Sequence, residues 1–491
     1  MPPLTIAASY RPGPLFHKTI AAFTRSGIVE RVIVVCPETV SPPPSGAYEL
    51  LPGSLSSGRT LIAILEDLRT NHLLLLPGAE QISAGPDTLH RMVEEARTTG
   101  AGMVYSDFND EGARGVSTHP LIDYQTGSVR DDFDFGAMML FQVSSVRHAL
   151  GKYGPISPVR FAGLYDLRLK VSVDHPLRRI GEPLYSIIEA DKSQSGEAIF
   201  AYVDPRNRAV QEEMERVFAE HLKNTGAYLS PEHLRNACES TGSFPVEASV
   251  IIPVKNRKGT ISDAVKSAFS QETDFPFNVI VVDNHSTDGT TGALSGLAGK
   301  FPALVHIVPA RTDLGIGGCW NEALYAGQCG RYAVQLDSDD LYSGPSTLQK
   351  IVDLLRRGRY GMVIGSYTIV NFDLHEIPPG LIDHREWTDG NGHNNALRIN
   401  GLGAPRAFDT GLMRAFGFLN VSYGEDYAAA LRVCREYRIG RIYENLYFCR
   451  RWEGNTDAAL SIPEINRNNI FKDKVRTDEI LARKKINMEG A

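Results

Sequence analysis

The sequence contains one pattern twice, in the same order. Residues 58–104 align without a gap onto residues 317–363, and both stretches hold a nearly identical block, GPDTL in the first and GPSTL in the second. Further along, RIGEPLY at 179–185 matches RIYENLY at 441–447. Matches that keep their order along a chain indicate that one fold is repeated. We therefore expect two copies of a single kind of domain.

The repeat sets the expected domain boundaries. A chain of 491 residues is expected to hold roughly two to four domains, and the two copies predict domains at residues 1–195 and 245–456. Between them, apolar residues at helical spacing predict a helical linker over residues 196–244. Residues 457–491 are highly charged and are expected to form a C-terminal helical segment.

Strand and helix patterns alternate in the second copy. Residues 249–253 and 279–282 are short apolar runs typical of strands covered on both faces, and apolar residues between them share one helical face. A strand, a helix and a strand in this order predict a right-handed crossover and a parallel sheet. The expected fold class is therefore α/β, with mainly parallel sheets covered by helices. Ligands of such sheets bind beyond the carboxyl ends of the strands.

Composition and charge exclude several classes of function. A net charge of -7 argues against nucleic acid as the main partner, and six cysteines without a CxxC pair fit reduced thiols. The N-terminus lacks the pattern of a secretion signal, and no apolar run approaches the ~20 residues of a membrane-spanning helix. We expect a cytoplasmic protein without a transmembrane segment, for which peripheral contact with a membrane stays open.

Acidic residues follow two of the predicted strands. The carboxylate of Asp283 can accept hydrogen bonds from a base or a ribose, or it can cap the next helix. Asp337, Asp339 and Asp340 follow the buried run 332–336, where like charges repel one another unless a cation or solvent intervenes. A hard divalent ion, Mg²⁺ or Mn²⁺, takes such oxygen ligands. The alternative is a solvated acidic turn.

A third acidic pair opens a predicted helix. Glu425 and Asp426 precede the apolar helical face of Ala430, Leu431 and Cys434. The helix dipole favours acids in a first turn, so a capping role is one interpretation. The other is a general base that takes a proton from an attacking hydroxyl.

With these motifs the second copy resembles the family 2 glycosyltransferases with the GT-A fold. The resemblance is carried by SVIIPVKNR, VVDNHSTDGT, the D-x-D element LDSDD and the acidic pair in GED. It implies two tandem GT-A-like (nucleotide-diphospho-sugar transferase) domains, of which residues 245–456 are the catalytic one. The implied activity is a metal-dependent, inverting hexosyl transfer from a nucleotide sugar, with a UDP-sugar favoured. The acceptor would be a glycan, a lipid-linked molecule or another hydroxyl compound.

The resemblance also implies roles for single residues. Asp426 matches the catalytic base, with Glu425 beside it, and Asp339 and Asp337 match the acids that hold Mn²⁺ or Mg²⁺. The expected donor-binding residues are Pro253, Asn256, Arg257, Asp283, Ser286, Asn321, Asp337 and Ser338. Further candidates are Arg311, His393, which could be a metal ligand or a surface histidine, and Arg450 and Arg451.

Two departures refine the expectation. In the repeat alignment Gly78 takes the place of Asp337, and Gly163 and Leu164 take the places of the GED acids, so residues 1–195 are expected to be a degenerate, non-catalytic copy. Processive family members carry a Q-x-x-R-W element, and the comparable stretch around Trp452 lacks the glutamine. A non-processive enzyme is expected.

Two other functions stay open at this stage. A sugar-phosphate nucleotidyltransferase usually needs a glycine-rich loop after its first strand, and residues 254–259 contain a single glycine. A catalytically inactive carbohydrate-binding scaffold would not need the intact acids of the second copy. The sugar, the nucleotide and the acceptor are not identified by the sequence.

Overall fold

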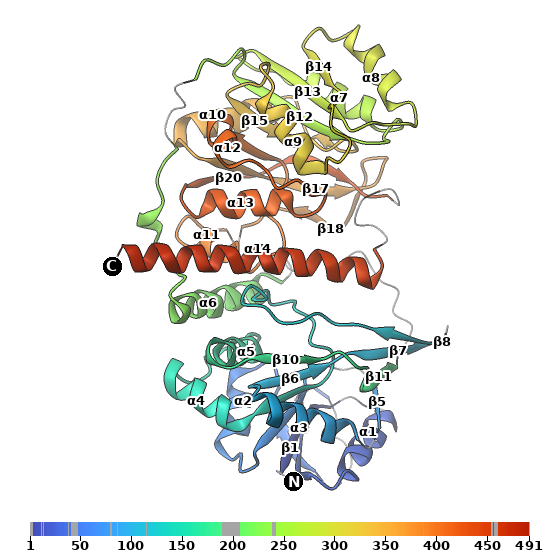
Figure 1. The fold of residues 1–491 in the computed structure, drawn as a ribbon, viewed down its shortest axis with the longest axis vertical. Helices are drawn as coiled ribbons and strands as arrows, with labels where there is room; N and C mark the ends of the chain where they lie inside the picture. The colour runs from blue at the N-terminus through green and yellow to red at the C-terminus, as the bar shows by residue number, and fades with distance from the viewer. Residues whose placement is uncertain are drawn as a thin grey trace. The chain divides into compact units, whose positions relative to one another are not determined.

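Two structural units make up the chain in the computed structural model (Figure 1). The structure describes residues 3–490 except 11, 13, 38, 41–47, 79–80, 86, 114, 189–206, 238–241, 386, 453–454 and 456–459. Unit 1 comprises Met1–Ser195, Ala209–Tyr228 and Ser461–Ala491, and unit 2 comprises Gly196–Arg208 and Leu229–Leu460. Residues 196–206 of the expected linker lie outside the described residues.

The C-terminal helix α14 (Ile462–Glu489), red in Figure 1, groups with unit 1 although it follows unit 2 in the sequence. The buried carboxylate of Asp473 accepts hydrogen bonds from Ser128 Oγ at 2.7 Å and from Arg476 Nη1 at 2.8 Å. Asn487 bonds the carbonyl oxygens of Gly226 and Tyr228. The domain boundaries expected from the sequence were contiguous, whereas the units are not.

Unit 1 holds a seven-stranded sheet in the order β10-β6-β9-β4-β1-β2-β3 and a smaller sheet in the order β5-β11-β7-β8. Its strands are β1 (Leu4–Ser9), β2 (Val29–Cys36), β3 (Glu49–Pro52), β4 (His72–Leu76), β5 (Gln81–Ala84), β6 (Met103–Ser106), β7 (Phe108–Gly112), β8 (Gly115–His119), β9 (Met139–Gln142), β10 (Leu177–Ile180) and β11 (Tyr185–Ile188). Its helices are α1 (Pro14–Thr24), α2 (Gly58–Glu66), α3 (Thr88–Thr99), α4 (Val143–Tyr153), α5 (Gly163–Asp174), most of α6 (Arg208–Thr225), and α14.

Unit 2 holds one sheet in the order β14-β13-β12-β15-β19-β17-β20-β16, with β18 paired to β17. Its strands are β12 (Ala248–Val254), β13 (Phe277–Asp283), β14 (Leu304–Ile307), β15 (Tyr332–Gln335), β16 (Leu341–Tyr342), β17 (Met362–Val370), β18 (Glu376–Ile382), β19 (Arg406–Asp409) and β20 (Ile439–Arg450). Its helices are the short η3 (Pro231–His233), α7 (Ile261–Phe269), α8 (Thr290–Ala298), α9 (Ile316–Tyr325), α10 (Thr347–Gly358), α11 (Gly392–Asn395), α12 (Thr410–Phe416) and α13 (Glu425–Cys434).

The main sheets of the two units share strand order and orientation. From β3 to β10 in unit 1, and from β14 to β20 in unit 2, all neighbouring strands are parallel except for one inserted antiparallel strand, β9 or β19. Met103 and Met362, which the repeat aligns, both face the antiparallel strand, opposite Phe141 and Phe408. The expected α/β class with mainly parallel sheets is confirmed.

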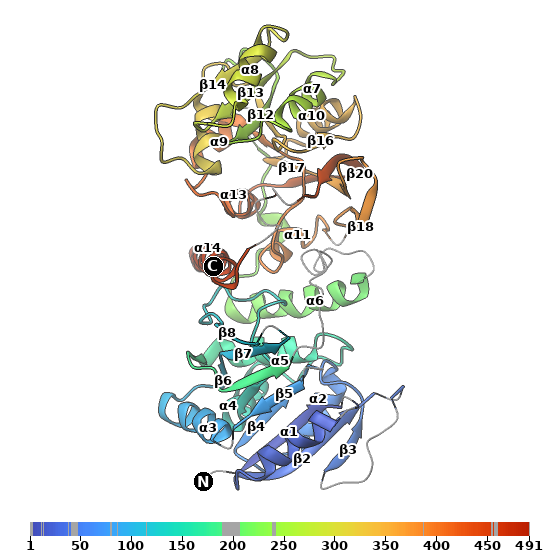
Figure 2. The ribbon, with the colours of Figure 1, turned by 90° about the vertical axis from the view of Figure 1, so that its right-hand side faces the viewer.

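The central strands of unit 2 are buried, which explains their apolar runs. Val250, Ile252, Val279, Val281 and Val334 have no exposed surface and belong to one core cluster. Helices pack against this sheet, which Figure 2 shows from a second direction. Because β12, β13 and β15 are parallel, their carboxyl ends meet at one edge. Strand β19 runs the other way, so its first residue, Arg406, reaches the same edge.

None of the helices in the described part of the chain is both long and apolar enough to cross a membrane.

Gly317 lets helix α9 pack closely against the segment that leads into α13. A Cβ atom on Gly317 would lie 1.9 Å from the carbonyl oxygen of Leu419 and 3.0 Å from Cβ of Glu425. A side chain at this position therefore has no room unless the segment moves.

We expect Gly317→Ala to lower the free energy of unfolding by about 1–3 kcal/mol, because the added methyl group overpacks this contact. Gly296→Ala in α8 is the matched control, since a Cβ there meets nothing within 4 Å. Alanine is the better helix former, so the control should gain up to about 1 kcal/mol. Chemical denaturation measures both, and equal effects would contradict the close packing.

Candidate active site

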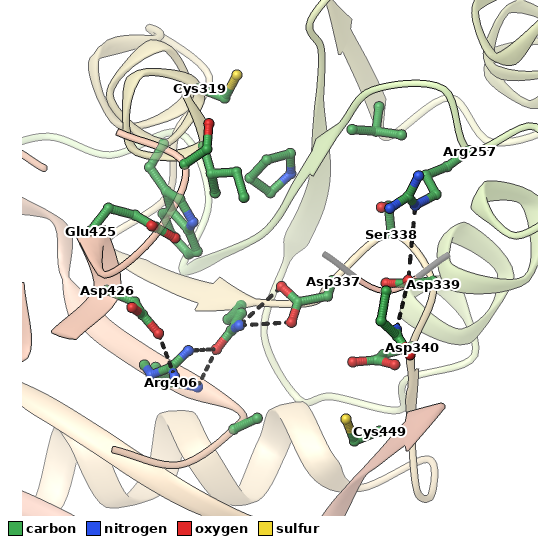
Figure 3. Close-up of a pocket in the computed structure, with 18 of the residues that line it drawn as sticks. Arg257, Cys319, Asp337, Ser338, Asp339, Asp340, Arg406, Glu425, Asp426 and Cys449 are labelled. Atoms are coloured by element: carbon green, nitrogen blue, oxygen red, sulfur yellow. Dashed lines mark hydrogen bonds and ion pairs between the residues drawn. The ribbon is translucent and has the colours of Figure 1, made fainter. Parts of the chain in front are cut away.

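A pocket of about 490 Å³ opens at the carboxyl edge of the unit 2 sheet (Figure 3). Segments that follow β12, β13 and β15 line it, together with the starts of β19, α9 and α13 and residues 449, 451 and 455. Stretches distant in the sequence thus meet around one cavity, as expected for an open α/β sheet.

Five carboxylates line this pocket. Asp337, Asp339 and Asp340 come from the turn after β15, and Glu425 and Asp426 are the first two residues of α13. The sequence motifs LDSDD and GED are therefore neighbours in space. Strand β15, which leads into the first three acids, is paired with β19.

Burial disfavours the ionised forms of three of these acids. Burial, and then the charges of neighbouring carboxylates, raise the pKa of Asp337 and hold the pKa of Asp340 well above its usual value. Burial, and next the charge of Asp426, raise the pKa of Glu425 to about 8. Within the described residues, Oε2 of Glu425 is buried without a hydrogen-bond partner. A ligand that brings positive charge or hydrogen-bond donors would stabilise the ionised carboxylates and bond the free oxygen of Glu425.

Arg406 is the cation closest to the base candidate, and the sequence motifs did not identify it. Its Nη2 lies 2.5 Å from Oδ2 of Asp426, and 13% of its side chain is exposed. Its Nη1 donates to Oε1 of Gln335 at 2.9 Å, and Gln335 Nε2 donates to both oxygens of Asp337 at 3.0 and 3.1 Å. No motif contains Arg406; its role depends on the pairing of β19 with β15.

Asp339 is held from the C-terminal side of the pocket. Its Oδ2 accepts hydrogen bonds from Trp452 Nε1 at 3.1 Å and from Asn455 Nδ2 at 3.3 Å. Arg257 Nε lies 3.9 Å from the same oxygen. Arg450 donates to the carbonyl oxygen of Asp339, and its guanidinium lies 4.8 Å from the Phe372 ring centroid.

Asp283 lies outside the residues that line the pocket. Its fully buried carboxylate accepts hydrogen bonds from Ser286 N at 3.0 Å and Thr291 Oγ1 at 2.5 Å. Burial opposes its ionisation, but these hydrogen bonds outweigh burial and keep its pKa below the usual value. The bond from Ser286 N closes a local turn, while the helix that follows is capped by Gly289. The donor-binding role of Asp283 stays a prediction, and its neighbour Asn284 lines the pocket.

The remaining predicted donor-site residues divide into two groups. Pro253, Arg257, Ser338 and Arg451 line the pocket. Asn256 and Ser286 lie outside its lining and connect the loops after β12 and β13, since Ser286 Oγ accepts from Asn256 N at 2.9 Å. Asn321 also lies outside; its amide bonds both the N–H and the carbonyl oxygen of Phe418.

Three further candidates do not line the pocket. Arg311 is ion-paired with Asp313 at 2.7 Å on the surface. His393 is buried in α11, where its Nε2 lies 2.8 Å from the carbonyl oxygen of Leu229, so it is neither a surface histidine nor a residue of this pocket. Arg450 supports the Asp339 turn from outside the lining.

A family model matches part of unit 2. Residues 249–418 match the family model described as glycosyl transferase family 2. This stretch begins in β12 and ends just before α13, so it spans most of the pocket-forming segments. The match covers about a third of the chain, and within residues 249–418 the chain is similar to glycosyl transferase family 2.

Relatives by sequence are distant and partial. "Uncharacterized protein Rv1520" of Mycobacterium tuberculosis is 29% identical over 109 residues, which cover 22% of this chain and 31% of that protein. "Uncharacterized glycosyltransferase YfnE" of Bacillus subtilis is 37% identical over 79 residues, or 16% of this chain and 20% of that protein. The matches span less than a third of the length of these curated relatives.

Solved structures of similar shape are also distant. TarS 1-349 of S. aureus in complex with UDP-GlcNAc is 22% identical, with a TM-score of 0.37, over 48% of this chain and 72% of that chain. The M. tuberculosis glucosyl-3-phosphoglycerate synthase, solved with Mn²⁺, UDP and glucosyl-3-phosphoglycerate, is 18% identical, with a TM-score of 0.32, over 49% and 81%.

The raised pKa of Glu425 predicts a pH-dependent cost to folding. Its usual pKa is 4.5 and its folded value is about 8, so the folded state binds the proton more tightly. The cost is absent below about pH 4.5, grows as the pH rises, and is complete above about pH 8. Glu425→Gln removes the ionisable group. In metal-free buffer the variant should gain stability over wild type as the pH rises, by about 5 kcal/mol at most.

Denaturation between pH 5 and 9 in the presence of a chelator measures this difference. Glu232→Gln, at an exposed glutamate in η3, is the control and should follow the wild-type profile. If the stability difference between Glu425→Gln and wild type does not change with pH, the prediction that ionised Glu425 destabilises the folded state is contradicted.

Proposed function

We propose that unit 2 transfers a sugar from a nucleotide-sugar donor to a hydroxyl acceptor, with inversion at the anomeric carbon. The observation that carries this proposal is the meeting of Asp337, Asp339 and Asp426 in one pocket of a family 2 domain. Two of these acids come from the strand edge and one from a helix start. This separation leaves space for a reacting sugar between a donor-holding side and a proton-accepting side.

The donor would lie over the ends of β12 and β15. Pro253, Arg257 and Ser338 line that side of the pocket, and Arg451 adds a second cationic side chain. Guanidinium groups suit phosphate recognition because their donors match paired oxygens. A UDP-sugar is the donor class that the family resemblance favours, and a glycan or a lipid-linked molecule is the proposed acceptor.

The acids fit a divalent cation, Mn²⁺ or Mg²⁺. Mg²⁺ is commonly held by one or two carboxylates together with substrate phosphates, and Asp337 and Asp339 offer two. In the part of the chain that the structure describes, no group of three or more His, Cys, Asp or Glu side chains is arranged to hold a metal. The cation would therefore need the donor diphosphate as a further ligand. Bound there, it would neutralise the leaving diphosphate.

Asp426 would act as the general base. It accepts the proton of the acceptor hydroxyl while the hydroxyl oxygen forms a bond to the anomeric carbon. The bond between that carbon and the phosphate oxygen breaks on the opposite face, so the configuration inverts and the nucleoside diphosphate leaves. The 29% exposure of the Asp426 side chain gives the acceptor access to it. We propose a non-processive enzyme, which transfers one sugar each time that an acceptor binds.

Residues 1–195 are proposed to be a non-catalytic GT-A-like copy. The strand order of unit 1 equals that of unit 2, while Gly78 and Gly163 stand where the second copy has Asp337 and Glu425.

We expect Asp426→Asn to reduce transfer by about 10²–10⁴-fold, because a general base contributes roughly this much, while nucleotide binding stays nearly intact. A thermal-shift screen of nucleotide sugars with Mn²⁺ first identifies the donor through stabilisation by binding. Release of the nucleoside diphosphate then measures turnover. Asp313→Asn, at the exposed partner of Arg311, is the control. Wild-type turnover in Asp426→Asn would rule out its role as base.

Asp339→Ala is expected to remove the metal dependence of nucleotide binding, because one of the two proposed cation ligands is lost. Isothermal titration calorimetry with UDP, with and without Mn²⁺, measures this. In wild type and in Asp313→Ala, Mn²⁺ should strengthen UDP binding at least tenfold. The metal role of Asp339 is refuted if Mn²⁺ strengthens binding to Asp339→Ala by the same factor.

A further inference from the structure

A chain of hydrogen bonds joins the two acidic groups of the pocket across its floor (Figure 3). It runs from Asp337 to Gln335 Nε2, and from Gln335 Oε1 to Arg406 Nη1 at 2.9 Å. Arg406 Nη2 then meets Asp426 Oδ2 at 2.5 Å. The chain thus connects the acid expected at the cation with the acid expected to accept the proton.

In each hydrogen bond of this series, only one assignment of donor and acceptor is chemically possible. Arginine has only donors and an ionised carboxylate has only acceptors, so the residue between Arg406 and Asp337 has to accept on one side and donate on the other. A glutamine amide does both without adding a charge. Gln335 Oε1 also accepts from the backbone N–H of Arg406 at 3.2 Å, which fixes it further.

Arg406 is held at three points. Its Nε donates to the carbonyl oxygen of Leu402 at 2.6 Å, while Nη1 and Nη2 contact Gln335 and Asp426. Because the guanidinium is planar and its Nε and Nη1 are already bonded, the direction in which Nη2 donates is fixed. The Asp426 carboxylate is oriented as a consequence.

The sheet itself does not require a polar pair at this position. In unit 2 the register pairs Tyr332 with Asp409 through Val334 with Ala407, which brings Gln335 opposite Arg406. In unit 1 the equivalent strands pair His72 with Gln142 through Leu75 with Met139. By the strand pairings, Leu75 and Met139 take in unit 1 the place of Gln335 and Arg406. The gapless repeat alignment puts Leu76 at Gln335, so the residue there is a leucine in either alignment.

We propose that Gln335 and Arg406 are positioning residues, whose hydrogen-bond chain orients the Asp426 carboxylate relative to Asp337 for proton removal. This inference rests on the proposed function of Asp426. Arg406 also places a fixed positive charge among the acids. The charged or titratable groups that interact with it are Asp337, Glu425, Asp426 and Tyr367. A divalent cation bound by Asp337 and Asp339 is repelled by this charge.

Two opposite effects follow from removing Arg406. Turnover should fall, because Asp426 loses its orientation, and Mn²⁺ binding should tighten, because a repelling charge is gone. A residue needed only for folding would weaken both.

The main test is the double variant Gln335→Leu with Arg406→Met, which installs the apolar pair of unit 1 and is expected to fold. Its kcat should fall at least 100-fold with the KM for the donor changed less than about threefold, and calorimetry with Mn²⁺ alone should show about tenfold tighter binding. Arg406→Lys keeps the positive charge but loses the planar guanidinium with its several N–H donors. It should leave Mn²⁺ affinity near wild type and give a kcat between those of wild type and the double variant. Arg414→Gln is the control, because Arg414 bonds Leu324 and Ala326 carbonyls away from the pocket.

A second measurement separates this inference from the proposed function. A double-mutant cycle of Arg406→Met and Asp426→Asn in thermal unfolding reports their coupling without any substrate. The coupling should shrink in the Gln335→Leu background, since Gln335 holds Arg406 in place. If wild type turns over no donor, the proposed function fails, but the measured coupling still tests the hydrogen-bond series from Asp337 to Asp426. If the double variant keeps wild-type kcat, or weakens Mn²⁺ binding, the positioning role is overturned.

Discussion

The concentration of carboxylates at one buried sheet edge is the constraint on which the rest of unit 2 depends. Burial, and after it the charges of neighbouring carboxylates, raise the pKa values of Asp337, Asp340 and Glu425, so the ionised forms of these acids are disfavoured in the pocket. Arg406 pairs with Asp426 at 2.5 Å, and Arg257 lies 3.9 Å from Asp339. A protein keeps such an unfavourable arrangement when it has a use for it, and a cation with a diphosphate supplies the missing charges.

The two units separate what the sheet requires from what the site requires. Both main sheets have the same strand order with one antiparallel insertion, and both are built from buried apolar runs. The differences concentrate at the carboxyl edge. Gly163 stands at the helix start where unit 2 has Glu425, and Leu75 with Met139 stand where unit 2 has Gln335 with Arg406. The sheet is thus a scaffold that folds with or without chemistry at its edge.

Much of the fold and part of the site could be predicted from the sequence, for identifiable reasons. Buried parallel strands leave continuous apolar runs, and acids directly after such a run lie at the sheet edge, so the D-x-D acids were found. The GED acids were found because they open an amphipathic helix and match a motif of the family. Arg406 was missed because its neighbours come from an antiparallel strand pairing between residues 335 and 406, which no local pattern reveals. Asp283 follows its strand as expected, yet its carboxylate bonds Ser286 and Thr291, a local choice that spacing cannot decide. His393 was weighed as a ligand or a surface residue and is instead buried against Leu229.

The central claim is that one pocket holds the nucleotide, the cation and the base together. A crystal structure of the protein grown with UDP and Mn²⁺ tests it most directly, because the anomalous signal of manganese locates the ion independently of the model of the protein. We expect one ion bonded to Asp339 and to the diphosphate, with Asp426 facing the vacant sugar position. An ion or a uridine bound away from Asp337 and Asp339, or Asp426 turned out of the pocket, would contradict it.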